Sequence, residues 1–175
     1  LSVTLQGISN VSLHFEDVLK APLELLQPPP TLCASNLPYS VAGPFVIEAL
    51  QRLPGVRRYC LMVQREVAER MAAAPGTKTY GILSVWVQLY AHMERVRHLS
   101  RTIFHPQPNV DSSLLVLERH SPTEIPPLPP SQLRRVIQAA FGQRRKTVVN
   151  SLSAGLELPR EHTLAILAAA GISPE

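Results

Sequence analysis

The chain has 175 residues, of which 45% are hydrophobic and 17% charged, and its formal net charge is +4. This length suits one domain, or one domain with a small satellite, and the apolar fraction is sufficient for a buried core. No apolar run reaches the roughly 18–20 residues of a membrane span, no secretory leader is visible, and two cysteines exclude a disulfide framework or a four-cysteine zinc site.

The first 120 residues alternate between predicted strands and helices. In chain order, the pattern predicts a strand over 11–15, a short helix or turn over 18–26, a strand over 31–34, a helix over 45–53 opened by Pro44, a strand over 58–64, helices over 65–74 and 81–90, and strands over 93–99 and 112–117. This alternation favours an α/β layered domain with a largely parallel sheet and one antiparallel hairpin at its edge. Cys33 and Cys60 lie in strand-like runs and are interpreted as small core residues of a reducing compartment.

A proline-rich segment separates this part from a purely helical one. Residues 121–130 contain five prolines and read as a stiff, extended linker between a first domain over 1–120 and a second over 131–175. Beyond the linker, helical spacing predicts one apolar face, with Ser131 as N-cap and Gly142 as the end of the helix. That face consists of Leu133, Val136, Ile137, Ala140 and Phe141. Two further helices are predicted over 147–152 and 161–170, the last closed by Gly171.

The sharpest local feature is Asn36-Leu37-Pro38-Tyr39, at the end of a predicted strand. In open α/β sheets, ligands bind beyond the carboxyl ends of strands. Asn36 offers a side-chain carbonyl acceptor, Pro38 removes one backbone donor, and Tyr39 offers a flat face for a planar ring. This combination suits an exocyclic amine on an aromatic heterocycle, which becomes nucleophilic when acceptors around its N–H groups draw the nitrogen toward a pyramidal form. From these four residues alone, an ordinary Asn/Pro turn after a strand is an equal alternative.

The tetrapeptide resembles the catalytic motif of S-adenosylmethionine-dependent adenine-N6 methyltransferases. Four further segments, in the same order as in that group, resemble motifs of the rRNA adenine dimethyltransferases: VQREVAER over 63–70, TYGILSV over 79–85, FHPQPNVDSS over 104–113 and AFGQRRKTVVNSL over 140–152. The chain is most similar to the small-subunit rRNA adenine N6,N6-dimethyltransferase family, whose loss gives kasugamycin resistance in bacteria. The resemblance implies a Rossmann-like class I methyltransferase sheet followed by a small all-helical C-terminal domain.

The resemblance also assigns catalytic roles to single residues. Asn36 is expected to hold the target amine beside the methyl donor, and the backbone at Leu37 and Pro38 to accept from the same amine. Tyr39 is expected to stack on the target adenine and Phe104 to pack on the other side of that base, which must leave its own stack as in base flipping.

The cofactor that the resemblance implies is S-adenosylmethionine. Asp17 matches the acidic residue that the family uses for the adenine amino group of this cofactor, although spacing alone favours a solvated turn at Glu16-Asp17. Asn36 is the second expected cofactor contact. The six histidines have no metal-ligand spacing, so no metal is expected.

A run of basic residues opens the helical part. Five positive charges and no acid lie between Gln132 and Asn150, namely Arg134, Arg135, Arg144, Arg145 and Lys146. Such a run is often only a solvated face. Here it precedes a predicted helix start at Thr147, where backbone N–H groups favour phosphate, so rRNA backbone binding is the preferred interpretation.

The implied activity is dimethylation of adjacent adenosines near the 3′ end of small-subunit rRNA, by a monomer that acts on rRNA or a pre-30S-type particle and not at a membrane. The expected location is the cytoplasm, or an organelle if an N-terminal targeting segment has been lost. The alternatives are a large-subunit rRNA methyltransferase of the antibiotic-resistance type, a non-catalytic assembly factor, or a relative among mitochondrial transcription factors. The family's glycine-rich G-x-G cofactor loop has no match, because no two of the eight glycines lie within two residues of each other. The chain also begins at Leu1 inside an apolar segment, so we expect a fragment that binds S-adenosylmethionine poorly by itself.

Overall fold

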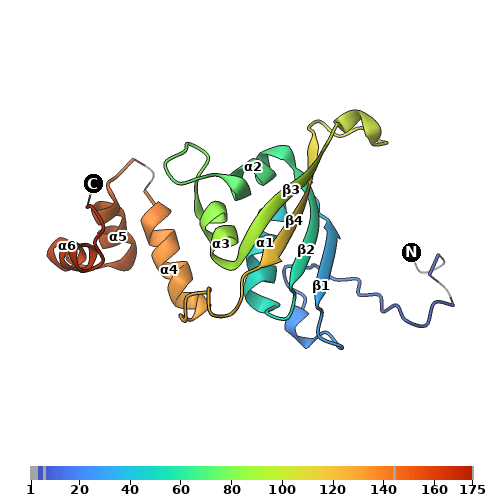
Figure 1. The fold of residues 1–175 in the computed structure, drawn as a ribbon, viewed down its shortest axis with the longest axis horizontal. Coiled ribbons are helices and arrows are strands. Elements are labelled where there is room, and N and C mark those ends of the chain that lie inside the picture. Colours follow the sequence, from blue (N-terminus) through green and yellow to red (C-terminus); the bar gives the residue numbers. More distant parts are fainter. Residues whose placement is uncertain (1–3, 6, 144, 175) are drawn as a thin grey trace.

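A computed structural model describes residues 4–5, 7–143 and 145–174 (Figure 1). In these residues, four strands and six α-helices follow the order expected for an α/β layer with a helical extension. The elements are η1 (Leu23–Leu25), β1 (Leu32–Asn36), α1 (Ala42–Arg52), β2 (Arg58–Gln64), α2 (Arg65–Ala72), α3 (Ile82–Tyr90), β3 (Ala91–Leu99), η2 (Arg101–Ile103), β4 (Ser112–Arg119), α4 (Pro130–Phe141), α5 (Val148–Leu156) and α6 (Arg160–Ala169).

The four described strands form one sheet in the order β1-β2-β4-β3. The β1–β2 pair is parallel, whereas β2–β4 and β3–β4 are antiparallel. The prediction of a largely parallel sheet is therefore wrong for these strands, because β4 returns directly after β3 without a crossover helix. The predicted antiparallel hairpin is confirmed, and β3 forms the edge of the sheet.

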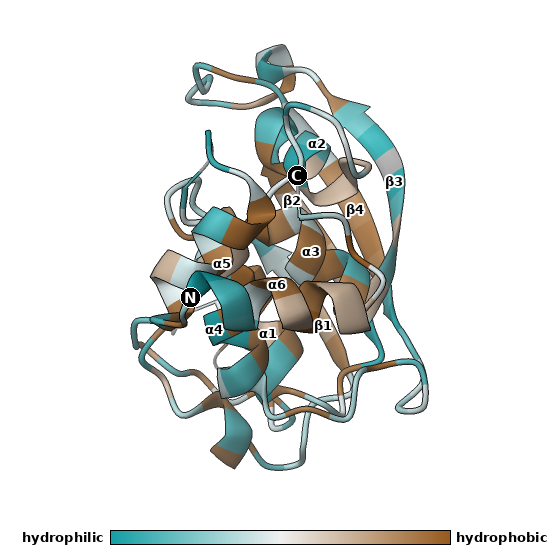
Figure 2. Cartoon of the chain, turned by 90° about the vertical axis from the view of Figure 1, so that its left-hand side faces the viewer, coloured by the Kyte–Doolittle hydropathy of each residue, from teal (hydrophilic) through white to brown (hydrophobic). Residues whose placement is uncertain are grey.

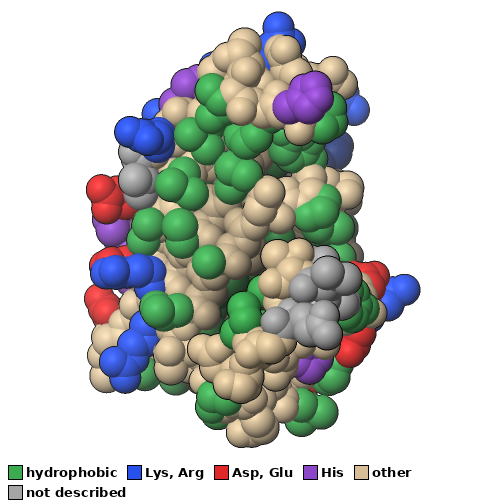
Figure 3. All heavy atoms as spheres, turned by 90° about the vertical axis from the view of Figure 1, so that its right-hand side faces the viewer, with side chains coloured by type: hydrophobic (Ala, Val, Ile, Leu, Met, Phe, Trp, Pro, Cys, Tyr) green, Lys and Arg blue, Asp and Glu red, His purple; other side chains and the backbone are tan. Residues whose placement is uncertain are grey.

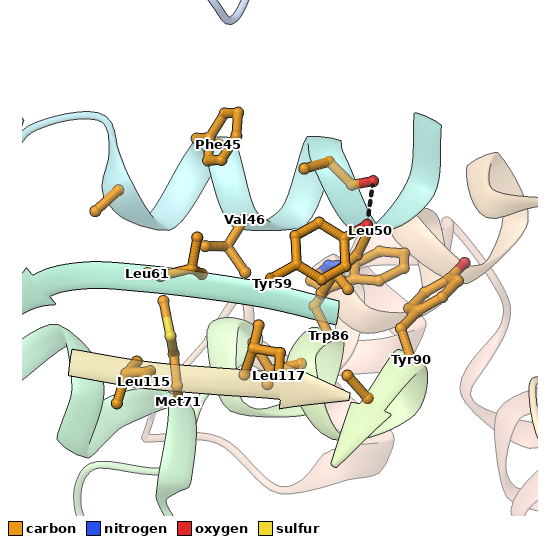
Figure 4. Close-up of a cluster of buried hydrophobic side chains, with 14 of the residues drawn as sticks. Phe45, Val46, Leu50, Tyr59, Leu61, Met71, Trp86, Tyr90, Leu115 and Leu117 are labelled. Carbon is orange, nitrogen blue, oxygen red and sulfur yellow. Dashed lines mark hydrogen bonds between the residues drawn. The ribbon is translucent and has the colours of Figure 1, made fainter. Parts of the chain in front are cut away.

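The core lies on one face of this sheet. Alternate residues of β2 and β4 point to this face, and Tyr59, Leu61, Val63, Leu115 and Leu117 are all buried there. Side chains of α1, α2 and α3 cover them, including Val46, Leu50, Met71 and Trp86 (Figure 4). In Figure 2, which is coloured by hydropathy, β2 and β4 carry many hydrophobic residues (brown), whereas the edge strand β3 is mostly hydrophilic (teal). Alternating burial thus orients the sheet against its helices.

Arg119, the last residue of β4, joins the C-terminal end of α1 to the sheet. Its guanidinium donates to the carbonyl oxygens of Leu50 at 2.6 Å, Val56 at 2.9 Å and Leu53 at 3.2 Å, and to the Tyr59 hydroxyl at 3.1 Å. The Tyr59 hydroxyl lies 3.1 Å from the Ala49 carbonyl. Carbonyls at the end of a helix lack partners within it, so Arg119 supplies donors that α1 needs.

The N-terminal prediction is wrong. Residues 11–15 form no strand, and Phe15 is 73% exposed. Alternation of apolar residues gives a strand only where a neighbouring strand accepts its hydrogen bonds, and none of the described strands pairs with this segment. The segment over 18–26 contains turns and the single 3-10 turn η1, as expected.

The first helix of the helical part begins two residues earlier than predicted. Pro130 is the first residue of α4 and Pro129 its N-cap, so Ser131 is not the cap, whereas Gly142 ends the helix as predicted. Ile137 is buried on the predicted apolar face, but Val136 is 48% exposed. Helix α5 crosses α4 closely, because a Cβ on Gly155 would lie 2.6 Å from Ala139. The helices predicted near Thr147 and Glu161 are present, and the division into domains at 121–130 stays a prediction.

Within the residues described here, no helix combines the length and the apolar character that a bilayer-spanning helix needs.

Candidate adenine pocket

The chain leaves β1 at Asn36 and turns through Leu37, Pro38 and Tyr39 into α1. The backbone N–H of Leu37 donates to the Met62 carbonyl at 3.3 Å, and the Leu37 side chain is buried. Leu37 therefore anchors the turn to the sheet, while its neighbours face outward. The position agrees with the predicted one, at the carboxyl end of a parallel strand.

These residues line one pocket of about 390 Å³. Asn36, Leu37, Pro38 and Tyr39 come from the turn after β1, and Phe104 comes from the loop between β3 and β4, so all five predicted catalytic residues lie around the same space. The Tyr39 side chain is 38% exposed and Phe104 is half-buried. Two aromatic rings bordering an open pocket form a surface on which a planar ring can stack.

The loop that carries Phe104 is fixed at its base by Asp111. The Asp111 carboxylate accepts the backbone N–H of Arg101 at 2.9 Å and lies 3.5 Å from His98 Nε2, and its carbonyl accepts the Arg65 N–H at 3.0 Å. The Arg101 guanidinium donates to the Asn109 carbonyl at 3.3 Å. These contacts tie the two ends of the loop to each other, and Asp111 also ties it to the start of α2, so the loop holds Phe104 at the edge of the pocket that Tyr39 borders.

Hydrogen-bonding capacity in the pocket is concentrated at Asn36. Its side-chain amide has no hydrogen bond to any residue that the structure describes, and the same holds for the Leu37 carbonyl. The Pro38 carbonyl accepts the Val41 N–H at 3.1 Å, so one of its lone pairs is already used. Among the described residues, the Leu37 carbonyl is therefore free to accept from an amine, and the Pro38 carbonyl keeps one lone pair for this.

Asp17 does not border this pocket. Its carboxylate accepts the Leu19 N–H at 3.0 Å and lies 3.9 Å from the Lys20 ammonium, and it is half-exposed in a turn. The structure thus gives Asp17 the local bonds of a solvated turn. Its predicted contact with a cofactor stays a prediction.

The predicted basic cluster is divided between two environments. Arg134 donates to Glu48 at 2.9 Å and Gln51 at 2.8 Å on α1, so it joins α4 to the sheet layer and its charge is shared with an acid. Arg135, Arg145 and Lys146 are exposed, and Arg144 lies outside the described residues. Arg134 and Lys146 also border a groove of about 1320 Å³ between α1, the α2–α3 loop and α4, where the Tyr80 and Phe141 rings lie 5.9 Å apart.

Four pocket residues were not identified as site residues from the sequence. They are Met62 at the end of β2, Pro106, Pro108 and Ser112. The two prolines and Ser112 belong to the segment 104–113, so the motif itself was a signal for them. No sequence motif pointed to Met62, because its position in the pocket depends on the parallel register that aligns it with Asn36.

Comparisons with known proteins bear on the same region. The sequence model described as "Ribosomal RNA adenine dimethylase" matches residues 3–173. A "Ribosomal RNA small subunit methyltransferase A" from Anoxybacillus flavithermus is 40% identical over 100% of this chain and 62% of its own length. The protein of the same name from Streptomyces griseus is 44% identical over 87% of this chain and 52% of its own length. This chain therefore spans between half and two thirds of these relatives.

Solved structures show the same fold. A dimethyladenosine transferase from Plasmodium falciparum has a TM-score of 0.74 and 24% identity, covering 98% of this chain and 61% of its own. The 23S rRNA methyltransferase ErmE has a TM-score of 0.62 and 22% identity, covering 99% of this chain and 68% of its own. At these identities the likeness concerns the fold alone, and it confirms the predicted α/β sheet with a helical C-terminal part.

Proposed function

Because this chain belongs to the ribosomal RNA adenine dimethylase family, we propose that the whole protein dimethylates N6 of adjacent adenosines near the 3′ end of small-subunit rRNA. The observation that carries the proposal is the convergence of Asn36, Leu37, Pro38, Tyr39 and Phe104 on one pocket. The relatives' printed name supports the small subunit as the source of the substrate. The ErmE likeness supports the fold and gives no separate support to a large-subunit substrate.

The pocket residues act on the target amine by position. The lone pair of an exocyclic adenine amine is delocalised into the ring, so the amine is a weak nucleophile. The Asn36 side-chain oxygen and the Leu37 carbonyl accept its two N–H groups and favour a pyramidal nitrogen whose lone pair points away from the ring. Tyr39 and Phe104 hold the base between their rings once it has left its stack. With a sulfonium methyl donor bound, the N–C bond would form as the donor's S–C bond breaks to leave a thioether, and the methylated amine would then release its proton to solvent, so the pocket needs no strong base before the transfer.

S-adenosylmethionine supplies, when bound, an electrophilic methyl group on a sulfonium. The chain fits this cofactor only in part, because Asn36 borders the pocket whereas Asp17 is bonded within its own turn, and no G-x-G sequence is present. We therefore propose that S-adenosylmethionine is the donor for the whole protein and that this chain alone binds it weakly. Among the described residues, no cluster of three or more His, Cys, Asp or Glu side chains could hold a metal ion.

The proposed RNA contacts lie in the helical part. Arg135, Arg145 and Lys146 are exposed cations beside the start of α5, where helix N–H groups add to the attraction for phosphate. Arg134 is bound to Glu48 and contributes mainly by setting the position of α4. We propose that residues 131–175 act as the rRNA-binding domain beyond the linker, toward rRNA within a small-subunit precursor in the bacterial cytoplasm.

Methyl incorporation separates this function from its alternatives. The whole protein, with labelled S-adenosylmethionine, should methylate small-subunit particles from cells that lack this modification, at the N6 position, and should leave large-subunit particles unmodified. Incorporation into the large subunit alone would favour the antibiotic-resistance type. Binding to small-subunit particles without any incorporation would favour a non-catalytic assembly factor.

A further inference from the structure

The loop between β3 and β4, residues 100–111 and here called the lip loop, extends beyond the sheet at the edge of the candidate adenine pocket. In Figure 1 it projects past the ends of both strands, and it contains the 3-10 turn η2. Three of its residues line the pocket, namely Phe104, Pro106 and Pro108. Other side chains of the lip loop lie outside the pocket, and the chemistry proposed for the target amine does not use them.

The exposed apolar side chains of the lip loop lie close to the pocket. Ile103 comes directly before Phe104 and is 64% exposed, and Val110 is 41% exposed. Across the pocket, Tyr39 is also exposed. Single exposed apolar residues are ordinary, but each of these three either lines the pocket or lies within two residues of one that does. The pocket therefore has an apolar border that solvent reaches.

The lip loop also carries groups that bind anions. Residues 100–110 contain Arg101 and His105, which are both exposed, and no acidic residue. The Arg101 guanidinium uses one donor on the Asn109 carbonyl, at 3.3 Å, and keeps its other N–H groups for a ligand. At the top of Figure 3, where the lip loop lies, cationic and histidine side chains (blue and purple) lie beside hydrophobic ones (green). Phosphates and base faces together match this mixture, so RNA is the partner that fits.

The turn that carries Ile103 is held in place before any RNA binds. The Ser100 hydroxyl accepts the Thr102 N–H at 3.3 Å, and the Ser100 carbonyl accepts the Ile103 N–H at 3.2 Å. At the base of the turn, the Arg101 N–H donates to the Asp111 carboxylate at 2.9 Å. A surface that is already ordered loses little conformational entropy on binding, so an exposed side chain on this turn can contribute to RNA affinity.

We propose that Ile103 contacts the nucleotide next to the target adenosine. When the target base lies between Tyr39 and Phe104, it leaves a gap in its own stack, and apolar side chains fill such gaps by packing on the neighbouring base. Ile103 packs on that base, and Arg101 and His105 attract the adjoining phosphates. This inference rests on the proposed function, because its partner is an RNA whose adenine has left the stack.

A fluorescent base beside the target reports this contact without any methyl transfer. Small-subunit particles are reconstituted from rRNA with a synthetic 3′ segment that carries 2-aminopurine directly before or directly after the two target adenosines. Binding of the whole protein should raise the fluorescence at one of the two positions, because the contact unstacks that base. Ile103→Ala should reduce the rise at least about threefold, since Ala is too short to reach the base, whereas Ile103→Leu should keep it. The control is Leu25→Ala, a 69% exposed apolar residue on η1, which is bonded to the far end of α1 through Glu24 and Arg52.

Single-turnover methyl transfer then tests the consequence for the reaction. Ile103→Ala should slow transfer about fivefold to tenfold on normal particles, and less than about twofold on particles whose neighbouring nucleotide is abasic, because the contact is already absent there. The KM for S-adenosylmethionine should not change.

The outcomes separate this inference from the proposed function. A fluorescence rise that needs Ile103, without methyl transfer by the unchanged protein, would contradict the proposed function and leave the contact standing. The contact is overturned if the unchanged protein gives no rise, if Ile103→Ala or Leu25→Ala gives the result expected of the other, or if Ile103→Ala slows transfer equally with and without the neighbouring base.

Discussion

The β1–β2 strand pair has two contrasting ends. At the bonded end, near Arg119, polar side chains form hydrogen bonds within the protein, whereas at the open end, near Asn36, they border an open pocket. Around Arg119, three carbonyls at and beyond the end of α1 and the Tyr59 hydroxyl all receive a hydrogen bond from one guanidinium. Around Asn36, the side-chain amide and the Leu37 carbonyl have no partner in the described part of the chain. The first end stabilises the fold, and the second leaves its hydrogen-bonding groups for a ligand.

This contrast separates residues that set stability from residues that set function. Buried polar groups without partners are costly, so the groups around Arg119 need their protein partner, whereas the exposed Asn36 amide can exchange water for a ligand at little cost. The same helix, α1, connects both ends, because its C-terminal carbonyls are held by Arg119 and its first turn follows Tyr39. A substitution around Arg119 should therefore lower the free energy of unfolding. A substitution around Asn36 should instead lower methyl transfer and leave the free energy of unfolding nearly unchanged.

The largest effect is expected at the bonded end. Arg119→Met should lower the free energy of unfolding by about 3–4 kcal/mol, because the carbonyls of Leu50, Leu53 and Val56 lose their common donor. Urea denaturation measures the loss. Arg57→Met, an exposed neighbour on the same side of the sheet, is the control and should change stability by less than about 0.5 kcal/mol. An Arg119→Met loss below about 1 kcal/mol would mean that other groups replace the guanidinium.

The second largest effect is expected on methyl transfer, for a substitution at Asn36. Asn36→Ala in the whole protein should reduce methyl transfer by about 10²-fold or more, because one acceptor for the target amine is removed. Stability should stay within about 0.5 kcal/mol, since the side chain is exposed and bonds to no described residue. Single-turnover methylation and thermal unfolding test the two parts. Activity that survives the substitution would remove Asn36 from the proposed site.

A smaller effect is expected at the exposed cations between α4 and α5. The double variant Arg145→Ala/Lys146→Ala should weaken binding to small-subunit rRNA about tenfold near 0.1 M salt and reduce the slope of log K against log[salt] by about 1.4–1.8. Filter binding over a salt series measures both quantities. The matched control Arg57→Ala/Arg97→Ala removes two exposed cations outside residues 131–175 and should keep the slope. Equal slopes for the two variants would indicate that the cluster is only a solvated face.

The smallest effect concerns a single hydroxyl at the bonded end. Tyr59→Phe should cost about 1 kcal/mol near neutral pH, since the hydroxyl bonds both Ala49 and Arg119. Burial raises the pKa of Tyr59, with the Arg119 hydrogen bond acting in the opposite direction. A raised folded pKa means that the stabilisation is complete below about pH 10 and is lost as pH rises through the folded value.

Denaturation at pH 7 and above pH 10 tests this expectation. The unchanged protein should lose stability over that interval, and the Phe variant should lose less, with the remaining loss coming from Tyr90 and Cys33, whose pKa values burial also raises. A Phe variant with the same pH dependence as the unchanged protein would contradict a buried, neutral phenol at position 59.

The sequence was most informative where local pattern and environment agree. Residues 58–64 contain a short apolar run, Tyr-Cys-Leu-Met-Val, between polar ends, which is typical of a buried strand, and β2 has the predicted bounds. Pro129, Pro130 and Gly142 mark the ends of α4 through backbone restrictions that act locally, although the N-cap differed by two residues from the expected Ser131. Five residues of the candidate adenine pocket could be named from motifs before the fold was known, because each motif keeps its order along the chain.

Other features depended on contacts between residues that are far apart in the chain, which a sequence pattern does not reveal. The alternation over 11–15 is as regular as that of a strand, yet backbone groups without a partner strand cannot form a ladder. Arg134 reads as one of five equivalent cations, but folding places it 2.9 Å from Glu48, where it joins two layers. Nothing in the sequence indicated the structural role of Arg119, because its hydrogen-bond acceptors are carbonyls of residues far away in the chain.

By itself, therefore, the sequence determined which segments are helices and strands after residue 31, which residues gather at the end of β1, and the family to which the chain belongs. Tertiary structure alone decided that the sheet is mixed and that Met62 and Ser112 complete the pocket. The physical reason is the range of the forces involved. Periodicity and turn chemistry act over a few residues, whereas register, burial and ion pairing join residues that are far apart in the chain.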